Sequence, residues 1–369
     1  MEWVRGETIG HGTFSTVSLA TPTNNAYGAF PQVMAVKSAD SHGAASLANE
    51  KWVLDILGND CDGLVRCLGE GRTVENGEEM HNLFLEYASR GSLASHLKKL
   101  NGEGLPESTV RRHTGSVLRG LRHIHAKGFA HCDLKLGNIL LFGDGAVKIA
   151  DFGLAKRAGE VTALMDGGVQ IRGTPLYMAP ESVNDNEYGS EADVWALGCA
   201  VVEMFSGKTA WSFKEGSHFM SLLIRIGVGD ELPRIPEDLS EQGRDFLSKC
   251  FVKDPKKRWT AEMLLNHPFV AVDLDQDDLE GVDIQLKTEE VFASPRCPFE
   301  FSSWVSASCD SGTQYHTLEA PEERVATLAA GSIPDWSVTN NWVIAQSYES
   351  NIIYRSKDLK TLGQSSWPL

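Results

Sequence analysis

The chain has 369 residues, of which 42% are hydrophobic, and a formal net charge of −16 at pH 7. This length allows one large two-lobed domain with an extension, or two to three small domains. The acidic balance argues against nonspecific binding to nucleic acid, and the sequence has no apolar run of about 18 residues that would predict a membrane-spanning helix.

The N-terminal residues and the cysteines favour a cytoplasmic or nuclear protein. Residues 1–5 lack the apolar stretch of a signal peptide, and Glu2 stands where N-myristoylation requires glycine. The seven cysteines are odd in number and include no C-x-x-C pair. Reduced thiols are therefore favoured over a disulfide framework or a zinc site.

Charge is unevenly distributed along the chain and indicates a domain boundary near Val270. Residues 271–369 hold 16 Asp and Glu against 6 Lys and Arg, so this segment carries −10 and residues 1–270 carry −6. We expect a folded domain over residues 3–270 and an acidic tail over 271–369. Two interpretations of the tail remain: a largely disordered segment with a few partner-binding patches, which we favour, or an inhibitory or stabilising segment that packs on the domain.

Residues 3–20 predict two short strands around a glycine-rich turn, Gly-His-Gly-Thr-Phe-Ser, at positions 10–15. Gly10 and Gly12 would let backbone N–H groups approach a phosphate closely, and Ser15 is expected to stiffen the tip of the turn. Taken alone this motif is weak, and a glycine hairpin without function is the better explanation.

The next two elements supply a lysine and a glutamate. The apolar strand over residues 34–37 ends at Lys37, and residues 47–57 carry apolar side chains at helical spacing with Glu50 at the edge of the apolar face. Each residue alone is explained by an ordinary solvated charge. The two together favour a functional pair.

Residues 83–88 predict an apolar strand that ends in a polar turn, which from the residues alone is nearly as well explained by a plain buried strand. Residues 108–127 predict a helix with His123 and His125 near its end. No third ligand is spaced for zinc, so these histidines are interpreted as ordinary residues of a helix C-terminus.

Residues 131–138, His-Cys-Asp-Leu-Lys-Leu-Gly-Asn, place an acid, a base and an amide close together, and Asp151 opens an Asp-Phe-Gly thirteen residues later. Phosphoryl transfer to a hydroxyl needs these groups in this order. Asp133 would accept a hydrogen bond from the acceptor hydroxyl, and Lys135 would neutralise the moving phosphoryl group. Asn138 and Asp151 would each hold Mg²⁺.

The intervening residues 139–149 predict a hairpin that delivers Asp151. Phe152 is expected to pack beside His131 and Leu54 in an apolar column. Residues 154–172 are expected to form a flexible segment.

Three further residues predict contacts over long sequence distances. Glu181, at the end of the segment Gly-Thr-Pro-Leu-Tyr-Met-Ala-Pro-Glu that starts at residue 173, is expected to pair with Arg258. If that pair is buried, losing either partner would cost ~3–5 kcal/mol. Asp193 is expected to cap backbone groups of residues 131–138, although a simple helix N-cap also explains it.

These motifs together resemble the protein kinases in order and spacing. The matching residues are Gly10, Lys37, Glu50, Asp133, Lys135, Asn138, Asp151, Glu181, Asp193 and Arg258. The resemblance covers residues 3–270 and implies a bilobal α+β fold, with a small, mostly β N-terminal lobe and a large helical C-terminal lobe. Lys135 and Thr174 indicate serine or threonine acceptors. The segment 173–181, with Trp-Thr-Ala-Glu before His-Pro-Phe at 267–269, is most similar to the MEKK-type MAP kinase kinase kinases of plants.

The resemblance also implies the site and its ligands, ATP and Mg²⁺. Lys37, Glu50, Asp133 and Lys135 would be catalytic, and Asn138 and Asp151 would bind the metal. The residues expected around the nucleotide are Ile9, Gly10, His11, Gly12, Thr13, Phe14, Ser15, Val17, Ala35, Lys37, Leu85, Glu86, Ala88 and Leu140. Among them, Leu85 would be the gatekeeper, Glu86 and Ala88 would offer backbone groups to adenine, and Val17, Ala35 and Leu140 would sandwich the base.

The implied substrates are MAP kinase kinases, phosphorylated on activation-loop serine or threonine in a stress or hormone signalling cascade. We expect a monomer, with regulators binding through the tail.

Cys132 stands where most kinases have an arginine that pairs with an activation-loop phosphate. A thiol does not form this pair, and residues 154–172 contain a single Ser or Thr, Thr162. Our hypothesis is that activity needs no activation-loop phosphate, and that control lies in abundance, partners or the tail. A Thr162→Ala protein with activity reduced about a hundredfold, ~2.7 kcal/mol of barrier, would contradict it. For Cys132 itself, a tolerated small residue is favoured over a redox role.

Two function classes therefore compete. The first is an active serine/threonine kinase. The second is a pseudokinase or scaffold, toward which only Ser15 and Cys132 point. The groups that perform the chemistry are all present, which favours the active enzyme. A kinase of small molecules is disfavoured by the peptide-substrate segment at 173–181.

Overall fold

The computed structural model describes residues 2–12, 14–23, 30–159, 172–212, 219–271 and 353–354. The predictions for Thr13 and Thr162 lie outside these residues, as do those for nearly all of the tail. The interpretations of the tail therefore stay predictions.

An antiparallel sheet forms the N-terminal part of the molecule, in the strand order β10-β1-β2-β3-β5-β4 within the described residues. Its strands are β1 (Trp3–His11), β2 (Thr16–Pro22), β3 (Met34–Ala39), β4 (Cys67–Glu75), β5 (Glu78–Glu86) and β10 (Ile353–Tyr354). The two strands predicted over residues 3–20 are confirmed as β1 and β2. In β3, Lys37 pairs with Val17 on one side and with Leu83 on the other.

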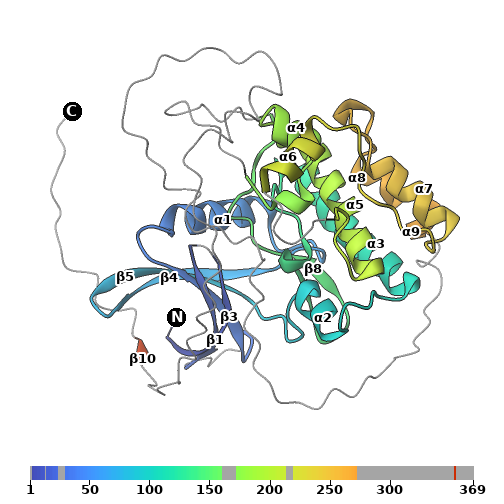
Figure 1. Ribbon diagram of the computed structural model, residues 1–369. Helices are drawn as coiled ribbons and strands as arrows, with labels where there is room; N and C mark the ends of the chain where they lie inside the picture. The colour runs from blue at the N-terminus through green and yellow to red at the C-terminus, as the bar shows by residue number, and fades with distance from the viewer. Residues whose placement is uncertain are drawn as a thin grey trace, which may run out of the picture.

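Helix α1 (Ala44–Leu57) lies alongside this sheet (Figure 1). Its buried residues recur at helical spacing and include Glu50 together with four apolar side chains. The helix begins directly after Gly43, where a Cβ would lie 2.0 Å from the carbonyl oxygen of Phe14. Only glycine therefore lets the start of α1 approach the glycine-rich turn so closely.

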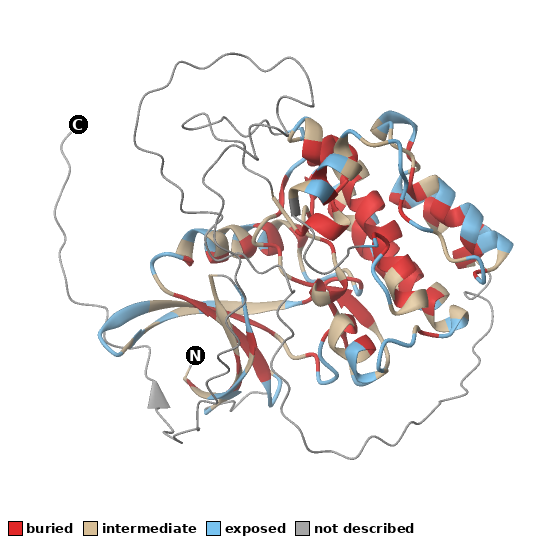
Figure 2. Cartoon of the chain, viewed as in Figure 1, coloured by how far each residue is buried: buried red, intermediate tan, exposed pale blue. Residues whose placement is uncertain are grey.

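Helices make up the C-terminal part, as predicted. They are α2 (Leu93–Lys99), α3 (Glu107–Ala126), α4 (Pro180–Asn184), α5 (Ser190–Ser206), α6 (Phe219–Gly227), α7 (Glu241–Cys250), α8 (Ala261–Leu265) and α9 (Pro268–Ala271). Figure 2 shows that buried residues are concentrated along α3 and α5. The observed α3 matches the predicted helix over 108–127 to within one residue. No helix in the described part of the chain is long and apolar enough to cross a membrane.

Short elements carry the functional loops where the two parts meet. The predicted hairpin is confirmed as β7 (Ile139–Leu141) and β8 (Val147–Ile149), with Gly145 at a positive φ of 83° in its turn. Strand β6 (Phe129–Ala130) pairs with β9 (Lys156–Arg157). Lys156 and Arg157 therefore form a strand, although the sequence analysis expects residues 154–172 to be flexible. The architecture confirms the bilobal α+β fold.

Candidate active site

Lys37, Glu50 and Asp151 converge, as the sequence predicts, from strand β3, helix α1 and the segment after β8. The Lys37 Nζ lies 2.6 Å from Glu50 Oε2 and 2.9 Å from Asp151 Oδ1. Glu50 is fully buried, and its other oxygen, Oε1, accepts a hydrogen bond from the Phe152 N–H at 3.2 Å. One ammonium group thus joins the sheet, the helix and the Asp-Phe-Gly segment.

Lys37 and Asp151 stabilise each other's charges, whereas burial raises the pKa of Glu50. Burial alone lowers the pKa of Lys37, but the carboxylates of Asp151 and Glu50 raise it well above its ordinary value. For Asp151, desolvation acts to raise the pKa, but Lys37 holds it well below the usual range of a carboxyl. Lys37 is therefore protonated and Asp151 ionised at neutral pH.

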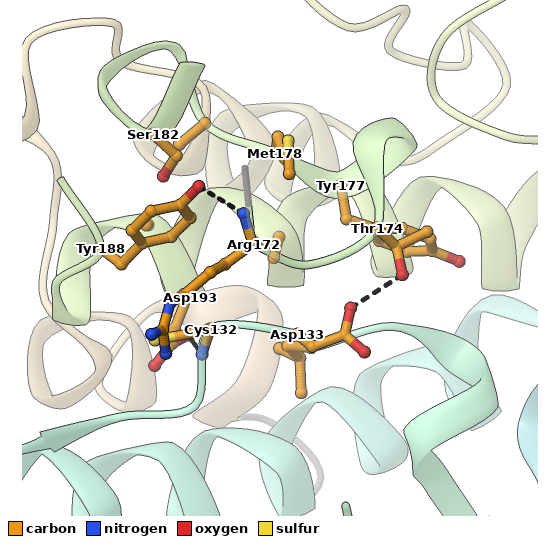
Figure 3. Close-up of a pocket in the computed structure, with 13 residues that line it drawn as sticks. Cys132, Asp133, Arg172, Thr174, Tyr177, Met178, Ser182, Tyr188 and Asp193 are labelled. Carbon is orange, nitrogen blue, oxygen red and sulfur yellow. Dashed lines mark hydrogen bonds between the residues drawn. The ribbon is translucent and has the colours of Figure 1, made fainter. Parts of the chain in front are cut away.

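Residues 131–138, which we call the catalytic loop, bring Asp133 and Lys135 together with Thr174 of the segment 173–181. The Thr174 hydroxyl donates to Asp133 Oδ1 at 2.7 Å, and Lys135 Nζ lies 2.9 Å from Asp133 Oδ2 and 3.0 Å from Thr174 Oγ1. Figure 3 shows the bond between Asp133 and Thr174. The Asp133 carboxylate thus accepts from a hydroxyl and from an ammonium group at once.

Asn138 closes the other side of this loop, at the end of the 3₁₀ helix η1 (Leu136–Asn138). Its Nδ2 donates to the backbone oxygen of Asp133 at 2.8 Å and to Oδ2 of the same residue at 3.1 Å. Its backbone oxygen accepts from the Ala150 N–H at 2.9 Å, which brings Asn138 beside the residue that precedes Asp151. Because Nδ2 is used in this way, Oδ1 of Asn138 and the carboxylate of Asp151, whose side chain is 46% exposed, are the oxygens that fit Mg²⁺.

Asp193, at the start of α5, caps the catalytic loop as predicted. Its carboxylate accepts from the backbone N–H of His131 at 2.8 Å and of Cys132 at 3.0 Å, and it contacts His125 Nε2 at 2.9 Å. Cys132 has a φ of +66°, a conformation that L residues rarely adopt. The buried carboxylate holds the loop in this conformation through two backbone bonds.

Phe152 packs where the sequence predicts. Its ring lies edge-on to His131 at a centroid distance of 5.1 Å, and it belongs to the same hydrophobic core as Leu54. The His131 Nε2 lies 3.1 Å from the backbone oxygen of Ala150. The predicted contact of Phe152 with His131 is therefore confirmed, next to Asp151 in the chain.

The described residues among those predicted around the nucleotide lie in β1 and β2 and at the turn between them, along β3, β5 and β7, and, for Ala88, just after β5. Ile9, Val17, Ala35, Leu85 and Leu140 pack on one hydrophobic core. The turn itself is closed by the Gly12 N–H, which donates to the Ser15 backbone oxygen at 2.7 Å, while Gly10 pairs with Val17 and His11 with Thr16. The Ala88 backbone oxygen accepts from the Gly91 N–H at 3.1 Å.

Glu86 has a contact that the sequence did not predict. Its carboxylate accepts from Lys148 Nζ at 2.7 and 2.9 Å and from the Arg66 N–H at 2.8 Å, and its own N–H donates to the Arg66 oxygen at 3.1 Å. The Glu86 N–H is thus engaged within the protein, and the contact of Glu86 with adenine stays a prediction. The sequence signal for this ion pair is a lysine, Lys148, inside the apolar strand β8. In the structure Lys148 is only 8% exposed.

Glu181 and Arg258 form the predicted ion pair. The Arg258 NH1 lies 2.6 Å from Glu181 Oε1, and its NH2 lies 3.0 Å from Oε2. Both side chains are buried, and Arg258 also donates to the backbone oxygens of Val252 and Glu191. The pair fixes the end of the 173–181 segment to the helical lobe.

Cys132 lies in the small pocket of Figure 3, beside Asp133, Arg172, Tyr188 and Asp193. Burial, assisted by the Asp193 carboxylate, raises the pKa of the thiol far above its ordinary value. A thiol with a raised pKa is neutral at physiological pH and is therefore a poor nucleophile. This supports a tolerated small residue and not a redox role.

Comparisons of the sequence with those of known proteins agree with this arrangement of residues. A model of the protein kinase domain matches residues 3–270. The chain is 72% identical over 345 residues to mitogen-activated protein kinase kinase kinase 20 of Arabidopsis thaliana. The matched region covers 93% of this chain and 99% of that relative. It is 40% identical over 277 residues to mitogen-activated protein kinase kinase kinase 18 of the same plant, covering 73% and 78% of the two chains.

Proposed function

Because the chain belongs to the protein kinase family, and within it to the plant MAP kinase kinase kinases of the MEKK type, we propose that it phosphorylates MAP kinase kinases with Mg·ATP as the donor. The chain is a serine/threonine kinase. Its protein kinase domain implies ATP and typically Mg²⁺, and the substrate class follows from the names of its relatives. The contact of Lys37 Nζ with both Glu50 and Asp151 is the observation that best supports activity.

The side chains divide the work of phosphoryl transfer. Lys37, held by Glu50, would form ion pairs with the α- and β-phosphates. Mg²⁺, when held by Asp151 and Asn138, would supply positive charge to the β- and γ-phosphate oxygens. Asp133 would orient the acceptor hydroxyl, since its Oδ1 already accepts from the hydroxyl of Thr174. Lys135, 2.9 Å from Asp133, supplies positive charge beside the transferred group.

The pseudokinase alternative is not favoured. Ser15 closes the glycine-rich turn through its backbone oxygen, and Cys132 supplies no reacting atom.

We further propose that the protein acts as a monomer in the cytoplasm or nucleus, in stress or hormone signalling, with regulators at its tail.

A phosphotransfer assay on a panel of kinase-dead MAP kinase kinases tests the function. Asp151→Asn removes the charge that holds Mg²⁺ and pairs with Lys37, so we expect activity to fall about a thousandfold, ~4 kcal/mol of barrier. Asp230→Asn changes an exposed carboxylate in the same way and is expected to keep wild-type activity. Equal signals from the wild type and Asp151→Asn would point to a contaminating kinase and support the scaffold alternative.

A further inference from the structure

Asn49, the residue before Glu50 on α1, holds the turn that follows Asp151. Its side-chain Nδ2 lies 3.3 Å from the backbone oxygen of Phe152, 3.2 Å from that of Gly153 and 2.9 Å from that of Ala155. A carbonyl oxygen only accepts hydrogen bonds, so the amide group must present its nitrogen to all three. No sequence motif singled out this residue.

The turn is compact and is held from two directions. The Ala155 N–H donates to the Phe152 oxygen at 3.0 Å, which closes residues 152–155 on themselves. Asn49 and Glu50 together bind both backbone polar groups of Phe152, because Glu50 Oε1 accepts its N–H while Asn49 donates to its oxygen. Helix and turn are also in close contact, since a Cβ on Gly153 would lie 2.5 Å from the Ser46 hydroxyl.

Helix α1 also contacts β6 and β9, the two strands that flank the catalytic loop. The half-exposed ring of Trp52 packs edge-on against Phe129 of β6 at a centroid distance of 5.4 Å. The guanidinium of Arg157, in β9, lies 5.5 Å from the centres of both rings. Because β9 follows the turn directly and β6 leads into His131, movement of the turn would be transmitted to the catalytic loop.

Position 132 is a cysteine, so the segment 131–138 carries no guanidinium at this position that could bind a phosphate on residues 154–172. The contacts of α1 with residues 152–157 are made by side chains of the helix itself, namely Asn49, Glu50 and Trp52. We propose that Asn49 is a positioning residue that fixes the turn 152–155 against α1 and thereby keeps Lys37, Glu50 and Asp151 assembled in the unphosphorylated protein. The proposal rests on the kinase function given above.

Asn49→Asp tests the donor while keeping the shape of the side chain, since it turns a carboxylate oxygen toward three carbonyl oxygens. Asn49→Ala removes the group altogether. Lys51→Ala, which removes an exposed ion pair with Asp55 on the same helix, is the matched control. All three proteins and the wild type are assayed as full-length chains after phosphatase treatment. The readouts are kcat, KM for ATP, melting temperature and amide hydrogen exchange of residues 152–157.

We expect both Asn49 variants to lose at least about tenfold in kcat, ~1.4 kcal/mol of barrier, and to exchange the Ala155 amide faster than the wild type. Lys51→Ala is expected to change neither. Wild-type kcat and wild-type protection of Ala155 in Asn49→Asp would overturn the proposal. An equal loss in Lys51→Ala would also overturn it, because the effect would then belong to the helix and not to the amide.

Two controls keep these outcomes separate. If Asn49→Asp does not fold, as its melting curve would show, Asn49→Ala provides the same comparison. If the wild type itself transfers no phosphate to any panel member, the proposed function fails. The exchange rates of the turn, with and without Mg·ADP, then still decide the role of Asn49.

Discussion

At the scale of single residues, the pair of Glu181 and Arg258 shows what a buried charge requires. The two residues are 77 positions apart, and both oxygens of the carboxylate are bound by the guanidinium. Such a pair adds little net stability compared with apolar residues, because both ions lose their hydration. Removing only one partner is different, since the other charge stays buried without its counter-ion.

We therefore predict that Glu181→Gln lowers the free energy of unfolding by ~3–5 kcal/mol. Urea denaturation at pH 7.5 measures this loss, and Glu187→Gln, at an exposed position nearby, is expected to cost little. The double replacement of Glu181 and Arg258 by methionine is expected to recover part of the stability. A loss below about 1 kcal/mol in Glu181→Gln would show that Arg258 is satisfied by its backbone acceptors alone.

At the scale of elements, helix α3 contains a buried histidine that makes the fold sensitive to acid. His113 is 5% exposed. Burial lowers the pKa of His113 to about 4, assisted by the charges of Arg112 on the same helix, of His96 in α2 and of Arg90 just before α2. Between pH 6.5 and 4 the unfolded chain binds a proton at this residue and the folded chain does not, so stability falls as the pH falls through this range.

The expected loss from His113 over this range is roughly 3 kcal/mol. His113→Gln is polar and does not titrate, so its stability should depend less on pH between 6.5 and 4 than that of the wild type. Denaturation curves at pH 7.5, 5.5 and 4.5 would show the difference. Parallel pH profiles for the two proteins would mean that the pKa of His113 is the same in the folded and unfolded chains.

The elements also show which parts of the site the sequence could predict. Lys37, Glu50 and Asp151 were predicted as site residues because each lies in a motif whose spacing fixes its element. The pairing of Lys37 with Glu50 was also predicted, whereas the bond of Lys37 to Asp151 was not. The role of Asn49 was not predicted, because an asparagine on a helix has no signal until the turn that it binds is placed beside it. The ion pair of Lys148 was not predicted for a different reason. A lysine inside an apolar strand indicates that a partner exists, but the sequence does not identify Glu86, 62 residues away, as that partner.

At the scale of the whole molecule, the tail over residues 271–369 is the part whose structure the sequence pattern predicts least. Its acidic residues and scattered tryptophans give no period from which an element could be derived. The one described contact is the two-residue strand β10, which pairs with Trp3 and Val4 at the edge of the sheet. So short a pairing contributes little stability by itself.

We accordingly predict that a protein ending at Ala271 keeps the kinase activity of the full chain and melts within about 2 °C of it. Activity and melting temperature measured side by side test this prediction. A large rise in activity would instead indicate an inhibitory tail, and a large drop in melting temperature would indicate a stabilising one.

Trp52 gives the molecule an optical consequence. An indole that is 43% exposed on one side and stacked against a guanidinium on the other emits at a wavelength set by both surroundings. Any rotation of α1 away from β9 would take the ring off Arg157 and shift its emission. The difference spectrum between the wild type and Trp52→Phe would therefore report the orientation of this helix in solution, without a label and in real time.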